Sequence, residues 1–164
     1  MQLRVKIKRL NESVQLPKYA KPGDAGFDLV AAEDVLIQPG ETKIIKTGLA
    51  FEIPPGYELQ VRPRSGISRK TFLRVVLGTV DSGFRGEVGV IVSDTSYLGN
   101  SITLGINDEH GICASINYEI KKGDRIAQGV IAPVETAHFV EVDELSESER
   151  GVGGFGSTGI RGGK

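Results

Sequence analysis

The stretch KIIKTGLAFEIPPGYELQVRPRSG, residues 43–66, contains two runs rich in β-branched and aromatic residues and two turn strings. The runs cover 43–53 and 57–61; the string PPGY lies between them, and RSG follows the second. The pattern recurs in runs at 35–37, 88–93, 118–120 and 126–134 and in the turn strings QPGE, DSGFRG and KKGD. Glycine and proline at such short intervals end strands and reverse the chain. We therefore predict an all-β fold, an antiparallel sandwich or barrel, in place of alternating strands and helices.

The remaining segments complete the predicted organisation. Residues 3–8 alternate between apolar and cationic side chains, which is the period of a strand with one buried face. Residues 67–76 have some helical spacing, but their β-branched end limits a helix there to one or two turns. Residues 93–117 are polar and irregular, which predicts a long surface loop or an extra hairpin. We predict a barrel domain over 1–145 that includes this insertion, followed by a flexible glycine-rich arm over 146–164.

The composition excludes several classes of protein. With 164 residues, 39% of them apolar, the chain is long enough for one domain with a sizeable core. A net charge of -1 argues against a general nucleic-acid or membrane binder, because such proteins carry an excess of cations. No apolar run approaches the roughly 18 residues that a membrane span needs. The single cysteine, Cys113, cannot form an internal disulfide and favours the cytoplasm, while His110 and His138 lack partners at zinc-ligand spacing.

The C-terminal stretch RGVGGFGSTGIRGGK, residues 150–164, has two interpretations. Seven of the fourteen residues after Arg150 are glycine, which is typical of a disordered tail. The alternative is a lid that closes over a nucleotide. Arg150 and the hydroxyls of Ser157 and Thr158 can bind phosphate, glycine-rich backbone can turn its N–H groups towards an anion, and Phe155 can stack on a flat base.

Two turns between predicted strands offer a site on which such a lid could close. In VRPRSGIS, residues 61–68, Arg64 and Ser65 precede a glycine, so a guanidinium, a hydroxyl and backbone amides converge. In GTVDSGFRGEV, residues 78–88, Asp81 is expected at a hairpin tip, where a carboxylate can hold a water molecule. Each string taken singly is also an ordinary turn former.

The two turns belong to an ordered set of five motifs. The motifs are DAGFDL (24–29), RPRSGIS (62–68), GTVDSGFRGEV (78–88), GDRIAQ (123–128) and RGVGGFGSTG (150–159). In sequence and in order this set resembles the five motifs of the trimeric dUTPases, the deoxyuridine triphosphate nucleotidohydrolases. The resemblance covers most of the chain. It implies a jelly-roll-like, distorted β-barrel and a homotrimer in which the C-terminal arm of one subunit closes over a site on its neighbours.

The resemblance also implies a reaction and a set of site residues. The reaction is hydrolysis of dUTP to dUMP and pyrophosphate by Mg²⁺-assisted attack of water on the α-phosphorus, which keeps uracil out of DNA and supplies dUMP for dTMP synthesis. Asp81 is implied as the general base or water-positioning carboxylate, and Asp28 as an outer contact of the metal through water. The residues implied in phosphate binding are Arg64, Ser65, Gly66, Gln128, Arg150, Gly156, Ser157 and Thr158. The residues implied in base and sugar binding are Gly78, Thr79, Val80, Phe84, Gly89 and Phe155.

The chain departs from the family pattern in two places. Phe84 stands where many members carry tyrosine, so the ring that excludes a 2′-hydroxyl remains but the phenol is lost. The segment 93–117 is longer than in minimal members, and it is either a tolerated surface excursion or, as in some phage-encoded relatives, a binding surface for a regulatory protein. Two alternatives to hydrolysis stay open: a dCTP deaminase of the same fold family, and a dUTP-responsive regulatory protein. A phage origin would place the protein in the host cytoplasm.

Overall fold

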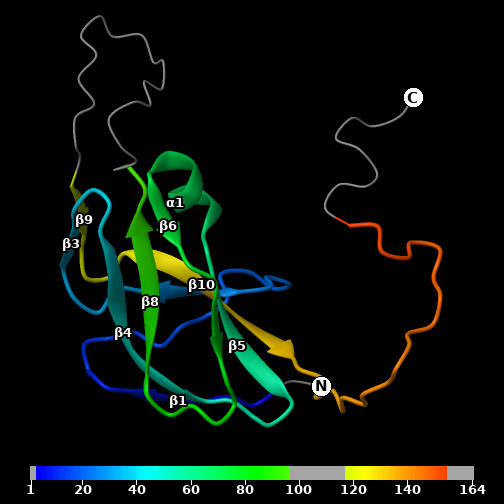
Figure 1. Ribbon diagram of the computed structural model, residues 1–164. Coiled ribbons are helices and arrows are strands. Elements are labelled where there is room, and N and C mark those ends of the chain that lie inside the picture. The colour runs from blue at the N-terminus through cyan, green and yellow to red at the C-terminus, as the bar shows by residue number, and fades with distance from the viewer. Residues whose placement is uncertain (1–2, 97–116, 155–164) are drawn as a thin grey trace, which may run out of the picture.

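The computed structural model describes residues 3–96 and 117–154, which are built mainly of antiparallel strands (Figure 1). The first sheet has the order β1-β4-β8-β6, formed by Lys6–Arg9, Thr42–Glu52, Glu87–Asp94 and Leu73–Val75. The second sheet has the order β2-β10-β5-β7, formed by Phe27–Val30, Arg125–Pro133, Tyr57–Arg62 and Gly78–Val80. A two-stranded sheet pairs β3 (Val35–Ile37) with β9 (Tyr118–Ile120), and a short helix, α1, spans Ser65–Lys70. The predicted all-β class is confirmed.

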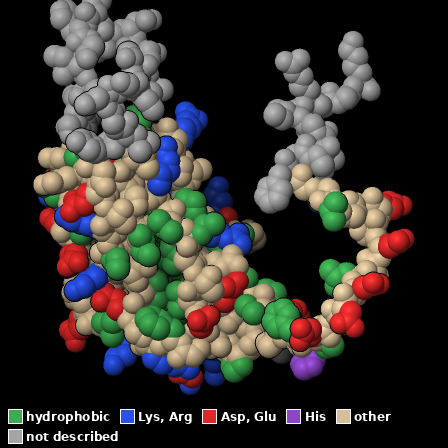
Figure 2. Space-filling model, in the orientation of Figure 1, with side chains coloured by type: hydrophobic (Ala, Val, Ile, Leu, Met, Phe, Trp, Pro, Cys, Tyr) green, Lys and Arg blue, Asp and Glu red, His purple; other side chains and the backbone are tan. Residues whose placement is uncertain are grey.

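A continuous buried cluster joins the two four-stranded sheets. Ile45 of β4 and Val90 of β8, from the first sheet, belong to the same cluster as Leu59 of β5 and Ile126 of β10, from the second. All four side chains are almost completely buried, and burial of each contributes about 1.5–3 kcal/mol to stability. Hydrophobic side chains also gather on the outer face of β4 and β8 (Figure 2). The sheets therefore have an apolar inner face and, in part, an apolar outer face as well.

The predicted runs agree closely with the strands. The runs at 35–37 and 118–120 coincide with β3 and β9, and the other four runs match β4, β5, β8 and β10 to within one residue. The N-terminal strand is shorter than predicted, since β1 covers Lys6–Arg9 and Leu3 is exposed. The strands β2, β6 and β7 were not predicted: β6 lies within the segment 67–76, whose spacing looked helical, and β2 and β7 lie within the motifs DAGFDL and GTVDSGFRGEV.

The segment 67–76 contains both a helix and a strand. The helix α1 begins at Ser65, two residues before the predicted segment, and ends at Lys70; β6 then begins at Leu73. Thr71 ends the helix in extended conformation, and both its backbone N–H and its hydroxyl donate to the carbonyl of Ile67, at 3.0 and 2.7 Å. The expectation of one or two helical turns is therefore correct. Within the described ranges, no helix is long and apolar enough to cross a membrane.

The C-terminal segment separates from the barrel after β10. The last strand, β10, ends at Pro133, and residues 134–152 are exposed and extend away from the sheets (Figure 1). In the single chain the last strand thus ends before residue 145, and the boundary at 145 stays a prediction. Phe139 and Leu145, 91% and 89% exposed, resemble core residues in sequence, but the described part of their own chain does not cover them. At the other predicted insertion, β8 ends at Asp94 and residues 97–116 lie outside the described ranges.

Candidate active site

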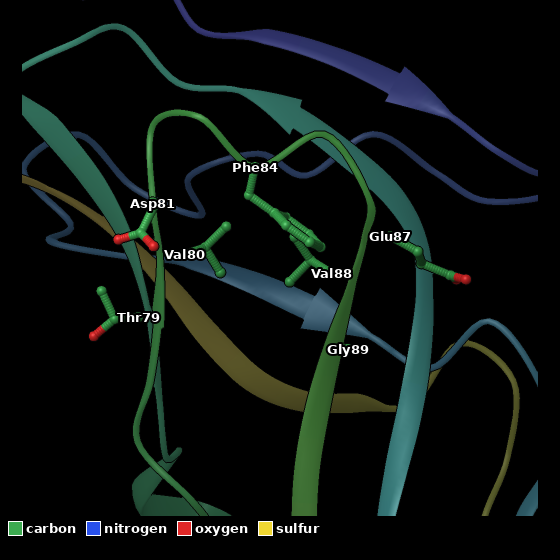
Figure 3. Close-up of a pocket in the computed structure, with 7 residues that line it drawn as sticks. All are labelled: Thr79, Val80, Asp81, Phe84, Glu87, Val88 and Gly89. Atoms are coloured by element: carbon green, nitrogen blue, oxygen red, sulfur yellow. The ribbon is translucent and has the colours of Figure 1, made fainter.

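A pocket of about 220 Å³ lies at the connection between β7 and β8 (Figure 3). The expected hairpin is not formed: β7 pairs with β5 in the second sheet and β8 with β4 and β6 in the first, so the connection crosses from one sheet to the other. Its tip is closed by a turn in which the Phe84 N–H donates to the Asp81 carbonyl at 3.0 Å, and the Arg85 guanidinium donates to the Ser82 carbonyl at 2.6 Å. The pocket is lined by Thr79, Val80, Asp81, Phe84, Glu87, Val88 and Gly89. Five of the site residues predicted from the sequence are therefore brought together here.

Asp81 lies at the rim of this pocket. Its side chain is exposed, and in Figure 3 the carboxylate points away from the ring of Phe84. Among the residues that the structure describes, none donates a hydrogen bond to this carboxylate or forms an ion pair with it. Both oxygens are therefore available to a water molecule, as a general base requires.

The ring of Phe84 forms the apolar side of the pocket. It lies beside Val80 and Val88 and is 45% exposed (Figure 3). A Cβ atom added at Gly86 would lie 2.5 Å from Cζ of this ring, so the position of the ring requires glycine at 86. At Gly89 an added Cβ would lie 2.5 Å from Cγ2 of Ile44. The absence of a side chain at Gly86 thus leaves room for the Phe84 ring, and its absence at Gly89 leaves room for the Ile44 side chain of β4.

A second cluster of predicted site residues lies on the second sheet. Gln128 of β10 is the register partner of Asp28 on β2, and on its other side it is the partner of Arg62 on β5. Arg64, just after β5, contacts Asp28 through Nε and Oδ1 at 2.9 Å and donates from Nη1 to the Arg125 carbonyl at 3.1 Å. Three segments far apart in sequence thus place two arginines, a carboxylate and an amide side by side.

The carboxylate of Asp28 is surrounded by positive charge. Besides Arg64, Arg125 approaches it from Nη1 to Oδ2 at 3.5 Å. The Arg64 contact is an ion pair without hydrogen-bond alignment, because Nε has no aligned acceptor among the described residues. Ser65 and Gly66 follow directly as the first residues of α1, and both are exposed. Asp28 therefore neutralises and orients the arginines next to the exposed hydroxyl and amides.

The two clusters remain separate within one chain. None of the residues that line the Asp81 pocket belongs to the cluster of Asp28, Arg64 and Gln128. A neighbouring groove of about 370 Å³ contains Gly78 and Thr79, but it too lacks these three residues. Arg150 lies on the exposed arm, and the predicted residues Phe155, Gly156, Ser157 and Thr158 lie outside the described ranges. The register of β5 and β7 separates the two clusters along one sheet: Asp81 follows Val80, the partner of Leu59, whereas Arg64 lies beyond the other end of β5.

Three residues at these clusters had no role in the prediction. Glu87 and Val88 line the Asp81 pocket, and Arg125 contacts Asp28. All three lie inside the motifs GTVDSGFRGEV and GDRIAQ, so membership of a motif was the signal that could have identified them. A metal cage is not formed by the described residues, in which no three His, Cys, Asp or Glu side chains cluster.

Comparisons with known proteins point to one family. The family described as dUTPase matches residues 12–105 and 113–159. The deoxyuridine 5'-triphosphate nucleotidohydrolase of Nautilia profundicola is 49% identical over 159 residues, which cover 96% of this chain and 99% of that protein. The dUTPase of Staphylococcus bacteriophage 80alpha, solved with dUPNHPP, has a TM-score of 0.81 at 36% identity and covers 96% of this chain and 99% of its own. A tyrosine-to-phenylalanine variant of that phage enzyme with dUpNHpp has a TM-score of 0.79 at 36% identity and the same coverage.

Proposed function

Because this chain belongs to the dUTPase family and hydrolyses dUTP to dUMP and pyrophosphate, we propose that each active site combines the Asp81 pocket of one subunit with the Arg64 cluster of another. The observation that carries this proposal is the separation of the two clusters in a single chain. A triphosphate whose base lies in the Asp81 pocket needs cations at its other end. The cluster of Arg64, Ser65, Gly66 and Gln128 supplies them only from a second copy.

The proposed reaction requires one proton transfer. A water molecule held by Asp81 attacks the α-phosphorus, a new P–O bond forms, and the bond from the α-phosphorus to the bridging oxygen breaks. The proton of the water passes to the Asp81 carboxylate, and pyrophosphate leaves. Arg64, Ser65, the Gly66 amide and Gln128 hold the phosphates. Arg150, Gly156, Ser157 and Thr158 of the arm contact the γ-phosphate, and Phe155 stacks on the uracil.

Base and sugar selection belongs to β7, β8 and their connection in this proposal. Uracil presents an N3–H donor between two carbonyl acceptors, and the backbone of Gly78, Thr79 and Val80 offers both kinds of group at the edge strand β7. Cytosine reverses two of these polarities and would leave buried polar groups unpaired, which discriminates strongly. Gly89 keeps the opposite wall of the pocket free of a side chain.

The described residues fit a Mg²⁺ ion that the nucleotide brings with it. They form no carboxylate cage, and both oxygens of Asp28 already face arginine side chains. Mg²⁺ keeps several waters and takes its other ligands from phosphates, so such a site needs only outer-shell support. Asp28 can provide that support through water. When bound, the ion neutralises charge that develops on the phosphates.

Exposed apolar surface supports a homotrimer. On the outer face of the first sheet Ile44 is 67% exposed, and beside the groove on the second sheet Leu77 is 72% exposed. On the arm, Val140 and Val142 are exposed and alternate with acidic residues, which is the pattern of a strand with one apolar face. Exposed apolar surface of this extent is typical of subunit contacts. We propose that the arm from residue 134 onward packs on a neighbouring subunit.

A mixing experiment tests the shared site. We expect Asp81→Asn chains alone and Arg64→Ala chains alone to be nearly inactive, whereas co-refolded mixed trimers should recover about a quarter of the wild-type rate, because random assembly restores both residues to that share of sites. Native mass spectrometry should show assemblies of three 17.6 kDa chains. As a control, Asp81→Asn chains mixed with the double variant should recover nothing. Mixed trimers without recovered activity would place both residues in one subunit and contradict the proposal.

Phe84 is expected to exclude ribonucleotides. Removal of its ring in Phe84→Ala should open the pocket and reduce the preference for dUTP over UTP about 10- to 100-fold, measured as the ratio of kcat/KM values. Phe84→Tyr keeps the ring and serves as the control, with the preference retained or increased. The phage 80alpha variant with phenylalanine in place of tyrosine was solved with dUpNHpp. This supports the proposal that a site with phenylalanine at this place binds the nucleotide. An unchanged ratio in Phe84→Ala would remove the ring from sugar selection.

A regulatory role beside hydrolysis is a second candidate. Phage dUTPases, among them that of Staphylococcus bacteriophage 80alpha, control transfer of virulence genes by a proto-oncogenic G protein-like mechanism. For this chain we assign such a role, with a protein partner, to the segment 93–117, of which 97–116 lie outside the described ranges. The cytoplasm, where free nucleotide is available, is the proposed compartment for both activities.

A further inference from the structure

The strand β8 supplies one wall of the Asp81 pocket. Where it does so, its pairing with β4 is interrupted by a shift in register. Lys46 is the register partner of Gly89, but the next partner along β4 is Ala50, opposite Glu87. Residues 47–49 of β4 therefore face Val88 alone. A regular ladder cannot hold Val88 at this point, because a bulge interrupts the backbone pairing.

Two side chains replace the missing ladder bonds. The hydroxyl of Thr47, which is fully buried, donates to the Val88 carbonyl at 2.6 Å. The backbone N–H of Gly48 donates to Oε1 of Glu87 at 2.8 Å. One bond thus holds each of the two residues at the start of β8. Both bonds end on residues that line the pocket.

The backbone of Gly48, which donates a hydrogen bond to Glu87, is itself held in a fixed conformation. It has a φ of 67°, in the left-handed region, and an added Cβ would lie 2.6 Å from Cγ2 of Val14. Its carbonyl accepts a hydrogen bond from the Leu10 N–H at 2.9 Å. The backbone of Gly48 is therefore held by the N-terminal segment, independently of the turn that carries Asp81 and Phe84. The Glu87 side chain, which accepts a hydrogen bond from the Gly48 N–H, is held in place by the same contacts.

The side chain of Glu87 does not enter the pocket. Figure 3 shows it pointing away from Asp81 and Phe84, on the other side of β8. The turn that carries Asp81 and Phe84 ends at Glu87, where the chain re-enters the sheet. The Glu87–Gly48 bond thus fixes the C-terminal end of this turn, and the Thr47–Val88 bond fixes the wall beside the Phe84 ring.

We propose that Glu87 and Thr47 are positioning residues for nucleotide selection: through the bulge in β4 they set the spacing between the Phe84 ring and the Val88–Gly89 wall. This inference rests on the proposed role of the pocket in base and sugar binding. It predicts that loss of either bond widens the pocket. Binding of dUTP then weakens and the preference over UTP falls. Asp81 keeps its chemistry because it directly follows Val80, which is paired with Leu59 of β5, and the phosphate cluster lies on other segments.

The test compares three variants by kcat, KM and the ratio of kcat/KM for dUTP to that for UTP. Glu87→Ala leaves the Gly48 N–H without its acceptor and should raise KM for dUTP about tenfold and lower the ratio by a similar factor, with kcat within about threefold of wild type. Glu87→Gln keeps an oxygen acceptor of the same reach and should restore both values. Glu52→Ala, which removes an exposed carboxylate of β4 paired with Lys6, is the matched control and should change neither.

Specific results would overturn the proposal. If Glu87→Ala leaves KM and the ratio unchanged, or if Glu87→Gln fails to restore them, the bond to Gly48 does not position the pocket. A fall in melting temperature and active fraction at constant KM and constant ratio would show a purely structural role. If Glu87→Ala does not fold, Thr47→Val, which keeps the side-chain shape, provides the same measurement through the Val88 bond. Phe84→Ala, assayed in parallel, distinguishes a failure of the positioning role from a failure of the proposed function. If the ratio of kcat/KM values is unchanged in Phe84→Ala, the Asp81 pocket does not select the sugar.

Discussion

Asp81→Asn is expected to lower kcat for dUTP by about 10²- to 10⁴-fold, the usual contribution of a positioned general base. Asparagine has the shape of aspartate but cannot accept the proton of the attacking water. The wild-type carboxylate lies exposed at the pocket rim, and no described residue pairs with it, so its replacement disturbs no internal contact. Binding of dUTP should therefore stay within about threefold of wild type.

Pyrophosphate release measures the loss of kcat, and calorimetric titration with dUTP measures binding. Asp34→Asn is a suitable control, because Asp34 lies before β3, where it accepts from the Lys122 N–H at 2.8 Å, away from both clusters. The control should retain the wild-type kcat. If Asp81→Asn were fully active, Asp81 would have no part in the mechanism. If the variant bound dUTP much more weakly, its role would be substrate binding.

Truncation after Glu149 is expected to reduce the rate about 100-fold or more while the barrel stays folded. The deletion removes Arg150 and the glycine-rich motif, which we propose close over the γ-phosphate and the base. All the buried core residues precede residue 128, and β10 ends at Pro133, so the deletion removes none of the core. Apolar residues of the arm, such as Val140 and Val142, also remain for subunit contacts.

The melting temperature should match that of the full chain, and the mass in solution should still correspond to three chains, each lighter by the 15 deleted residues. A shorter deletion of residues 161–164 is the matched control: it removes RGGK but leaves the motif RGVGGFGSTG complete, and it should keep the wild-type rate. A wild-type rate after the longer truncation would show that the tail is no lid. A departure from the mass of three chains would show that it contributes to assembly instead.

The prediction of strands was accurate where it depended on neighbouring residues in the sequence. Strand ends next to PPGY and KKGD follow from turn chemistry, which depends on a few neighbouring residues, and the runs beside them were located to within one residue. The strand β6 was missed because Thr71 ends α1 after little more than one turn, within a segment whose spacing looked helical throughout. Phe139 and Leu145 resemble core residues in sequence, but no described part of their own chain covers them, so the sequence alone does not show what they pack against.

For the site, the motifs identified residues but not their arrangement. The order of the five motifs pointed to Asp81, Phe84, Arg64 and Gln128, because each lies in a short string with its own chemistry. The sequence alone thus determined the all-β class, the family and the reaction. Only the tertiary structure decided that Asp28 lies between two arginines, that Glu87 faces Gly48, and that Asp81 and Arg64 lie towards opposite ends of β5. These contacts join residues 36 to 97 positions apart, through strand register and a bulge, and register is set by packing across the whole sheet and not by neighbouring residues.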